Sequence, residues 1–149
     1  MTRSRIGAVL LALAATLAMA ATALATQARP VTITVESTIG GSDDPFVATG
    51  GVVCDEGDVS NAWGNFVGWQ SNTQAQIQLI KHFECEDGTF DVLLRVALDF
   101  ATCDTVGTWA VIDGAGAYER LRGTGSLTGD GDCGGNTILD VYEGSMHLN

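Results

Sequence analysis

The sequence predicts an all-β protein, an eight-stranded antiparallel up-and-down β-barrel preceded by a signal peptide. Several segments alternate apolar and polar residues with a period of two, which is typical of strands with one buried face. Clusters of Gly and Asp separate these segments, and no stretch carries a helical repeat. The connections are too short for parallel crossovers, so neighbouring strands should run antiparallel.

The first 25 residues have the order of a secretory signal peptide. A short basic start precedes an uncharged stretch from Ile6 to about Ala21, and Ala23-Leu24-Ala25 forms an A-x-A cleavage site. Residues 1–25 are therefore expected to be removed, leaving residues 26–149 as a single secreted domain. The alternative is a retained anchor, because about 20 apolar residues can span a bilayer. The high alanine content favours cleavage, with no stable membrane insertion afterwards.

The acidic composition excludes one class of partner. Eighteen acidic residues oppose seven basic ones, which gives a net charge of −11. Affinity for nucleic acids comes mainly from Lys and Arg side chains that neutralise phosphates, so we expect no nucleic-acid binding. The apolar fraction of 46% is too high for a disordered acidic tail.

The clearest strand signal runs from Phe90 to Phe100, where every even position is apolar and the odd positions are mixed. The preceding run, Ile77–Phe83, also alternates, and Glu86-Asp87-Gly88 between the two predicts a tight hairpin. Val31–Val35 marks the first strand. Less regular runs complete the eight: Phe46–Val53, Trp63–Trp69 (bent or bulged at its glycines), Val106–Ile112, Leu121–Thr128 and Thr137–Leu148.

Eight such strands in sequence order can close into a barrel without free edges, the alternative being an open two-sheet sandwich. The four cysteines lie in the exported part and predict disulfides rather than zinc, whose cysteine ligands come in closely spaced pairs. With alternating strand directions, Cys54 and Cys85 fall at one end, and Cys103 and Cys133 fall at the other. Of the three connectivities, only Cys54–Cys85 with Cys103–Cys133 avoids bridging opposite ends.

The segment Trp109–Leu127 contains a distinctive glycine pattern. It matches G-x-G-x-[YF]-x4-G-x-G through Gly114, Gly116, Tyr118, Gly123 and Gly125, with Leu121 inside the pattern. Gly114 and Gly116 suit a tight connection with positive φ, and Gly123 and Gly125 share one strand face that a large ring can approach closely.

This pattern resembles the allene oxide cyclase and dirigent barrel superfamily and its secreted bacterial members, as does the closing run Asp140–His147. The resemblance implies a calycin-like barrel that holds a hydrophobic ligand, with Tyr118 closing one mouth. It also implies a tendency to form homo-oligomers, for which Ile80, Leu93 and Ala97 on otherwise polar faces are the candidate surface.

The barrel interior is the candidate binding site. An eight-stranded barrel is just wide enough to be filled by its side chains or to hold one small ligand. We expect the large aromatic side chains, including Phe90 and Phe100, in this interior. Arg95, Asp140 and Glu143 are candidate polar groups beside them, and an outward position suits each of the three equally well. The candidate ligand-binding residues are Trp63, Trp69, Phe83, Trp109, Tyr118 and Tyr142.

The sequence assigns no catalytic residue. His82 shares a strand face with glutamines and should be solvent-exposed, and no G-x-S-x-G nucleophile motif occurs. The acidic turns Asp43-Asp44, Asp55–Asp58 and Asp130–Asp132 are expected to be solvated rather than calcium sites. We therefore expect no metal and no cofactor.

The leading hypothesis is a secreted, disulfide-stabilised barrel that binds a small hydrophobic ligand or acts as an extracellular interaction module. The alternatives are an isomerase or cyclase acting on a hydrophobic substrate inside the barrel, and a structural envelope protein with a solid core. A cavity with one carboxyl group of raised pKa among apolar walls would favour the enzyme. A cavity lined only by rings and aliphatic side chains would favour the binder. Because fold alone is a weak warrant for activity, we lean against an enzyme.

Overall fold

A computed structural model describes residues 27–38 and 41–149, so the predicted signal peptide lies outside the described residues. The described part forms eight strands and no helix, and it therefore contains no helix long and apolar enough to cross a membrane. The strands are β1 (Arg29–Thr38), β2 (Asp43–Thr49), β3 (Glu56–Trp69), β4 (Gln74–Cys85), β5 (Gly88–Asp99), β6 (Thr105–Gly116), β7 (Leu121–Asp132) and β8 (Thr137–Leu148).

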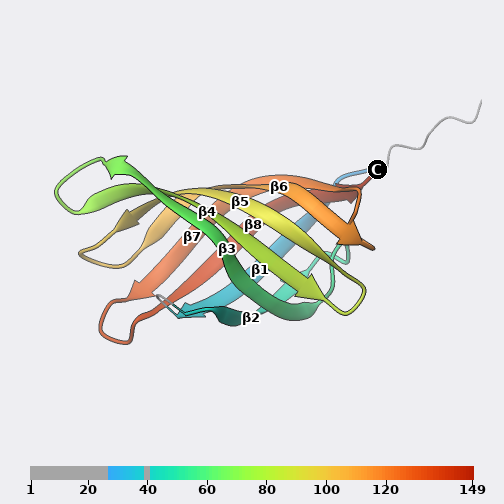
Figure 1. Cartoon of the computed structure of the whole chain (residues 1–149), viewed down its shortest axis with the longest axis horizontal. Coiled ribbons are helices and arrows are strands. Elements are labelled where there is room, and N and C mark those ends of the chain that lie inside the picture. Colours follow the sequence, from blue (N-terminus) through green and yellow to red (C-terminus); the bar gives the residue numbers. More distant parts are fainter. Residues whose placement is uncertain (1–26, 39–40) are drawn as a thin grey trace, which may run out of the picture.

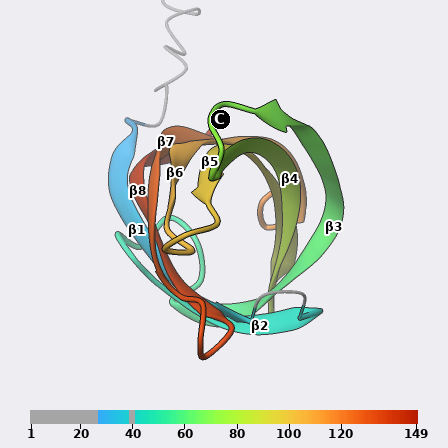
Figure 2. The same cartoon turned by 90° about the vertical axis from the view of Figure 1, so that its left-hand side faces the viewer.

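The strands form a closed barrel in sequence order, and all eight pairs are antiparallel (Figures 1 and 2). Closure comes from β1 and β8, which pair along their full lengths from Arg29 opposite Met146 to Thr38 opposite Thr137. The predicted eight-stranded antiparallel barrel is confirmed, and the open sandwich is wrong. Closure leaves inward and outward side chains alternating along each strand.

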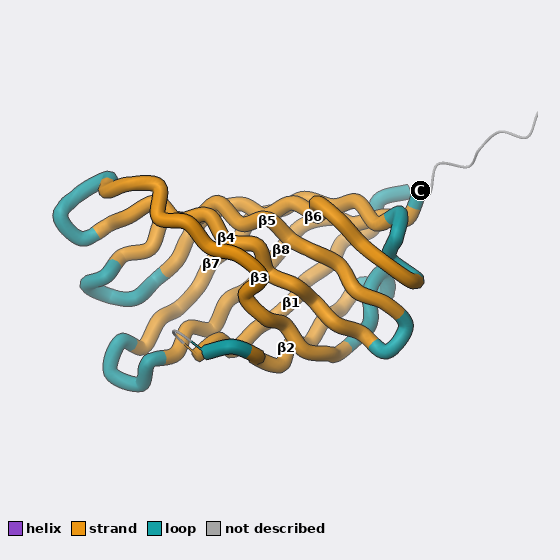
Figure 3. Tube along the Cα trace, in the orientation of Figure 1, coloured by secondary structure: helices purple, strands orange, loops and turns teal. Residues whose placement is uncertain are grey.

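The barrel has two unlike ends, which we name by their contents. The packed end carries the β2–β3, β4–β5 and β6–β7 connections, and the open end carries the other four (Figure 3). The chain leaves the barrel at the packed end, where β8 finishes (Figure 1). Because strand direction alternates in a meander, successive connections lie alternately at the two ends of the barrel.

One disulfide lies at each end of the barrel, with the predicted pairing of cysteines. Cys54 is bonded to Cys85 at the packed end, and Cys103 is bonded to Cys133 at the open end. Their Cα atoms lie 6.0 Å and 5.5 Å apart, within the usual range for a disulfide. Disulfides persist in oxidising compartments, so both bonds are consistent with an extracellular or otherwise oxidising environment.

Most strands are longer than the alternation predicted, and one is shorter. The run Phe46–Val53 was predicted as a strand, but β2 ends at Thr49. Gly50 and Gly51 have φ values of +109° and +63°, a left-handed backbone that an extended strand does not adopt. The predicted irregularity near the glycines of β3 is confirmed, since its pairing with β4 shifts register between Asn61 and Trp63 and again between Phe66 and Gly68.

The packed end is filled with aromatic rings. Phe83 stacks on Phe90 at 4.8 Å between ring centroids, and it meets Phe46 and Tyr142 edge to face at 5.1 Å and 5.9 Å. Tyr118 closes this end, with its ring 5.5 Å from that of Phe90 and its hydroxyl donating to Asp87 Oδ1 over 2.8 Å. This half of the barrel matches the expectation of a solid core.

The glycine pattern of the sequence makes room for one large ring and one tight turn. A Cβ atom on Gly125 or Gly144 would lie 2.6 Å from the ring of Trp109, so this buried tryptophan needs glycine at both positions. The Trp109 indole nitrogen donates to the Ser126 carbonyl oxygen over 3.0 Å. Gly116 adopts the predicted positive φ, +64°, in the turn before β7. Gly114 does not have a positive φ, but a Cβ atom there would lie 2.1 Å from the Tyr118 carbonyl oxygen. The motif therefore serves packing and backbone geometry.

Candidate ligand-binding site

Strand alternation turns several ionisable side chains into the barrel. In β4 the inward series is Ile77, Leu79, Lys81 and Phe83, so Lys81 occupies a position that apolar residues occupy on either side. Only 5% of the Lys81 surface is exposed. A lysine is almost never buried to this degree without partners of opposite charge.

Acidic side chains from two other strands reach the same level. Asp140 of β8 lies between Ile138 and Tyr142 in the inward series of that strand, and Asp44 of β2 precedes the buried Phe46. Both carboxylates interact electrostatically with Lys81. We call the following six residues the polar layer: Ser37, Asp44, Lys81, Thr105, Asp140 and Tyr142.

Hydrogen bonds hold part of the polar layer in place. The Thr105 hydroxyl donates to Asp140 Oδ1 over 2.9 Å, and the backbone N–H of Thr38 donates to Asp44 Oδ1 over 3.0 Å. Within the described residues, the buried Ser37 Oγ and Tyr142 hydroxyl have no hydrogen-bond partner. Leaving such a group buried and unpaired costs about 1–3 kcal/mol, which marks the layer as unsuited to a purely structural core.

Burial dominates the ionisation behaviour of the layer. It lowers the pKa of Lys81, and the charges of Asp140 and Asp44 oppose this shift. It raises the pKa of Asp140, whereas the hydrogen bond from Thr105 and the charge of Lys81 act in the opposite direction. The pKa of Tyr142 lies well above its ordinary value, because burial and the two nearby carboxylates disfavour its anion. The layer thus holds a weakened acid and a weakened base side by side.

A cavity of about 210 Å³ lies above the polar layer, toward the open end. Its lining includes four residues of the polar layer: Ser37, Lys81, Thr105 and Asp140. It reaches the open end, because Thr38 and Thr105, which are terminal residues of β1 and β6 there, line it as well. Aliphatic side chains form its walls: Ile77, Leu79, Leu94, Val96, Leu98, Leu127 and Ile138. The site is an apolar pocket with a polar base.

The predicted interior position of two tryptophans is wrong. Trp69 is 61% exposed and Trp63 is 46% exposed, and Phe100, expected inside as well, is 50% exposed. Trp63 is exposed because it faces outward, opposite Ile80. Trp69 is exposed because β2 pairs with β3 only from Glu56 to Ser60 and leaves the rest of β3 without a neighbour on that edge. The far half of β3 is therefore uncovered.

The other predicted binding residues are buried, but they do not line the cavity. Phe83, Trp109, Tyr118 and Tyr142 belong to the hydrophobic core. Tyr142 contributes to the site through its hydroxyl in the polar layer rather than through a ring facing the cavity. The cavity walls are aliphatic, so the structure brings together a set of residues different from the predicted aromatic one.

The candidate polar groups divide in the same way. Asp140 is buried, whereas Arg95 and Glu143 are exposed on the outer surface. The expectation that both members of Asp43-Asp44 are solvated is wrong for Asp44, which is 4% exposed. Among residues 27–38 and 41–149, no three His, Cys, Asp or Glu side chains are grouped as ligands for a metal ion.

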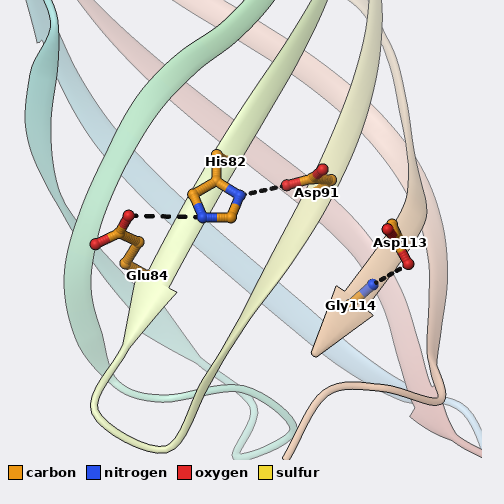
Figure 4. A network of polar contacts seen from close by, with 5 residues as sticks. All are labelled: His82, Glu84, Asp91, Asp113 and Gly114. Carbon is orange, nitrogen blue, oxygen red and sulfur yellow. Dashed lines mark hydrogen bonds and ion pairs between the residues drawn. The ribbon is translucent and has the colours of Figure 1, made fainter. Parts of the chain in front are cut away.

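A second polar cluster lies on the outer face of the barrel. His82 of β4 points away from the interior and lies between Asp91 and Glu84 (Figure 4). Its Nδ1 is 2.5 Å from Asp91 Oδ1, and its Nε2 is 3.5 Å from Glu84 Oε1. The ring is half-buried by these neighbours rather than fully exposed as predicted. Nearby, the Gly114 N–H donates to Asp113 Oδ1 over 2.9 Å.

Comparisons of the chain with protein-family models, with curated proteins and with solved structures find no match.

Charged residues at inward strand positions could have indicated the site from the sequence, although the prediction relied on aromatic residues instead. Lys81 interrupts the inward apolar series of β4, and Asp44 stands two positions before Phe46 in the inward series of β2. A charged residue at an apolar position of an alternating strand indicates a buried ion. Two such positions, together with Asp140, would have located the polar layer.

Proposed function

We propose that this protein is a secreted barrel that binds a small, uncharged amphiphile in its cavity, with the polar group of the ligand against the polar layer. The observation that carries the proposal is the burial of Lys81 and Asp140 in the lining of an aliphatic cavity that reaches the open end, with the buried Asp44 interacting electrostatically with Lys81. Ligand pockets have this character, with apolar walls and a few convergent polar groups.

A structural role would not require this arrangement. Buried charged groups generally contribute less to stability than apolar residues of similar volume would. The packed end of the same barrel shows that apolar rings can fill the available space. Charged residues beside an unfilled cavity therefore support a role in binding.

The charges of the polar layer favour an uncharged ligand. Two carboxylates surround one ammonium group, so a carboxylate on the ligand would be repelled. Ser37 lines the cavity, and its buried, unpartnered Oγ can both donate and accept a hydrogen bond. A hydroxyl or carbonyl group matches these partners.

Secretion and family assignment are part of the proposal. The leader-like first 25 residues and the two disulfides support export. The closed barrel and the Tyr118 ring at the packed end support an allene oxide cyclase or dirigent-like, calycin-like assignment. Relatives of that kind hold hydrophobic ligands in the barrel and often form oligomers.

Calorimetric titration with 1-heptanol, heptanoate and heptane tests the function. We expect heptanol to bind more tightly than heptanoate, which the carboxylates repel, and more tightly than heptane, which leaves Ser37 unpartnered. Ser37→Ala should weaken heptanol binding about fivefold to tenfold, since a hydrogen bond contributes about 1 kcal/mol. Lys81→Met should also weaken it.

The matched control is Arg95→Met, which removes an exposed cation from the neighbouring strand. It should leave heptanol binding unchanged. Ser37→Ala provides a readout even where Lys81→Met impairs folding. No heptanol binding, or binding that is indifferent to Ser37→Ala and Lys81→Met in folded protein, would overturn the proposal.

The raised pKa of Asp140 favours a second candidate, an isomerase that moves a proton on an apolar ketone. The Lys81 ammonium group would polarise the ketone oxygen, while the Asp140 carboxylate would take a proton from the adjacent carbon and return it at another. Incubation with a β,γ-unsaturated ketone should then give the conjugated α,β-isomer, which its ultraviolet absorbance reports. Asp140→Asn should abolish the reaction, and absence of the α,β-isomer with the wild type would exclude it.

A further inference from the structure

The exposed aromatic residues at the open end continue the inner surface of the cavity. We call Phe66, Trp69 and Phe100 the aromatic rim. The rings of Phe66 and Trp69 lie 5.6 Å apart between centroids, and those of Trp69 and Phe100 lie 5.4 Å apart. The three rings are half or more exposed, at 50%, 61% and 50%. A contiguous aromatic surface of this kind on a soluble domain indicates a contact site.

Strand register places the rim on the cavity side of the sheet. Directly opposed residues in an antiparallel pair project from the same face. Phe66 is opposite Ile77, which is opposite Val96, and both Ile77 and Val96 line the cavity.

The register also places Trp69 on the cavity side of the sheet. Trp69 is opposite Ala75, which is opposite the cavity-lining Leu98. The two rim residues of β3 are thus inward-facing side chains that remain exposed, because no strand covers that part of β3. The rim extends the cavity wall beyond the enclosed volume.

The rim is held rigidly at the mouth. The backbone N–H of Phe100 donates to the Thr73 carbonyl oxygen over 2.8 Å, which ties the β5–β6 loop to the β3–β4 hairpin. The side-chain amide of Gln74 donates to Asp99 Oδ2 over 3.2 Å, and the Cys103–Cys133 bond anchors the same loop to the β7–β8 hairpin. A fixed aromatic surface binds with a smaller entropic cost than a mobile one.

The cavity is smaller than most ligand pockets. Ligand pockets typically measure about 300–1,000 Å³, whereas this cavity measures about 210 Å³. Since a water molecule occupies about 30 Å³ in the liquid, the cavity holds about seven groups of that size. A longer ligand must extend through the open end, where the rim provides the adjacent apolar surface.

We propose that the aromatic rim binds the protruding apolar part of the ligand, so that the protein selects amphiphiles whose chain is longer than the enclosed cavity. This inference rests on the proposed function. It adds a second subsite and specifies the length of the ligand. The ligand would place its polar group at the polar layer, about seven heavy atoms inside the cavity, and further methylene groups across the rim.

A chain-length series of 1-alkanols from hexanol to dodecanol tests the inference by calorimetry. In the wild type, affinity should rise about twofold to fourfold for each added methylene across the series, fourfold being the value for full burial. In the triple variant Phe66→Ser, Trp69→Ser, Phe100→Ser, the rise should stop near heptanol, while heptanol itself binds as in the wild type.

Trp63→Ala is the matched control. Trp63 belongs to the same strand and is exposed to a similar degree, but it lies opposite Ile80 on the outer face. This variant should keep the wild-type length dependence. Trp69 provides a spectroscopic readout, since its emission should shift to shorter wavelength with dodecanol and not with hexanol, and Trp69→Phe should remove that shift. Circular dichroism checks that each variant is folded.

The outcomes separate this inference from the proposed function. If heptanol binds but the triple variant keeps the full length dependence, the rim proposal is overturned and the binding function stands. The same holds if Trp63→Ala and Trp69→Ala have equal effects. Sedimentation provides the remaining check, since a wild-type dimer that the triple variant dissociates, with length dependence unchanged, would assign the rim to a second copy of the chain. If no alkanol binds at all, the proposed function fails.

Discussion

The two ends of the barrel are built from the same eight strands, yet one is filled and the other holds a cavity. At the packed end, inward aromatic rings stack across the barrel, and Tyr118 closes the mouth. At the open end, the inward residues are aliphatic, and the nearby aromatic rings lie on the rim. The difference arises because β2 begins only at Asp43, opposite Ser60, and leaves the rest of β3 uncovered at the open end. Whether an inward-facing aromatic ring is buried depends on a neighbouring strand that covers it, and not only on the size of the ring.

The largest expected effect is the loss of a packed-end ring. Phe83→Ala should lower the free energy of unfolding by about 3–5 kcal/mol, because the ring contacts three others and leaves a void. Ile77→Ala, in the cavity wall, should cost less than about 2 kcal/mol, since its side chain already borders empty space. Urea unfolding measures both, and equal losses would refute the contrast between the ends.

Removing each disulfide in turn distinguishes its effect on overall stability from its effect on ligand binding. The bonds close loops of nearly equal length, with sequence separations of 31 and 30 residues, so replacing either pair by serine should cost about 3–4 kcal/mol. Only loss of Cys103–Cys133 should also weaken dodecanol binding, because that bond anchors the loop carrying Phe100. Unfolding and titration of both double variants test this. Equal weakening of binding in the two variants would contradict the assignment.

Replacing one glycine by alanine in each region compares how much space the two regions leave for a side chain. A Cβ atom at Gly125 would lie 2.0 Å from the Glu143 carbonyl oxygen and 2.6 Å from the Trp109 ring, so Gly125→Ala should destabilise by about 1–3 kcal/mol. At Gly68, beside the rim, a Cβ atom would meet nothing within 4 Å. Gly68→Ala should change stability by less than about 0.5 kcal/mol. Thermal unfolding compares them, with wild-type stability for Gly125→Ala as the contrary result.

The smallest expected effect is a change in pH dependence. The pKa of Asp140 in the folded protein is raised above its unfolded value of about 3.9, so the folded state holds a proton that the unfolded state has lost. Stability should therefore fall as pH rises from about 4 through the folded pKa, and Asp140→Asn should lack this fall.

Urea unfolding between about pH 4 and pH 7 measures the difference between the wild type and Asp140→Asn. Thr105→Val removes a hydrogen bond that lowers the pKa of Asp140, so it should move the fall to higher pH. A fall of the same size in Asp140→Asn would assign it to another group.

Much of the architecture could be predicted from local sequence patterns. The alternation of residues 90–100 and the Glu86-Asp87-Gly88 turn predicted a hairpin that the structure contains as β4 and β5. The order of strand directions then predicted both disulfides, because it decides which cysteines share an end. These inferences depend on residues close in the chain or on the simple geometry of a meander.

The site could be predicted only in part. Asp140 was a candidate polar group whose facing the sequence left open, and Tyr142 belongs to the polar layer. Trp63 and Trp69 were expected inside and lie exposed. Lys81 was not singled out, although its place in the inward series of β4 was visible. Burial of a side chain depends on whether a distant strand covers it, and β2 is too short to cover the end of β3.

By itself, the sequence determined the strands, their antiparallel order and the pairing of the cysteines, because alternation and short turns act over a few residues. Only the tertiary structure decided that Lys81 and two carboxylates meet inside the barrel, that an aliphatic cavity remains above them, and that three aromatic rings form its rim. These features require residues from β1 to β8 to meet around a closed ring. Their positions follow from where strands stop and which neighbours they cover, which residue type does not specify.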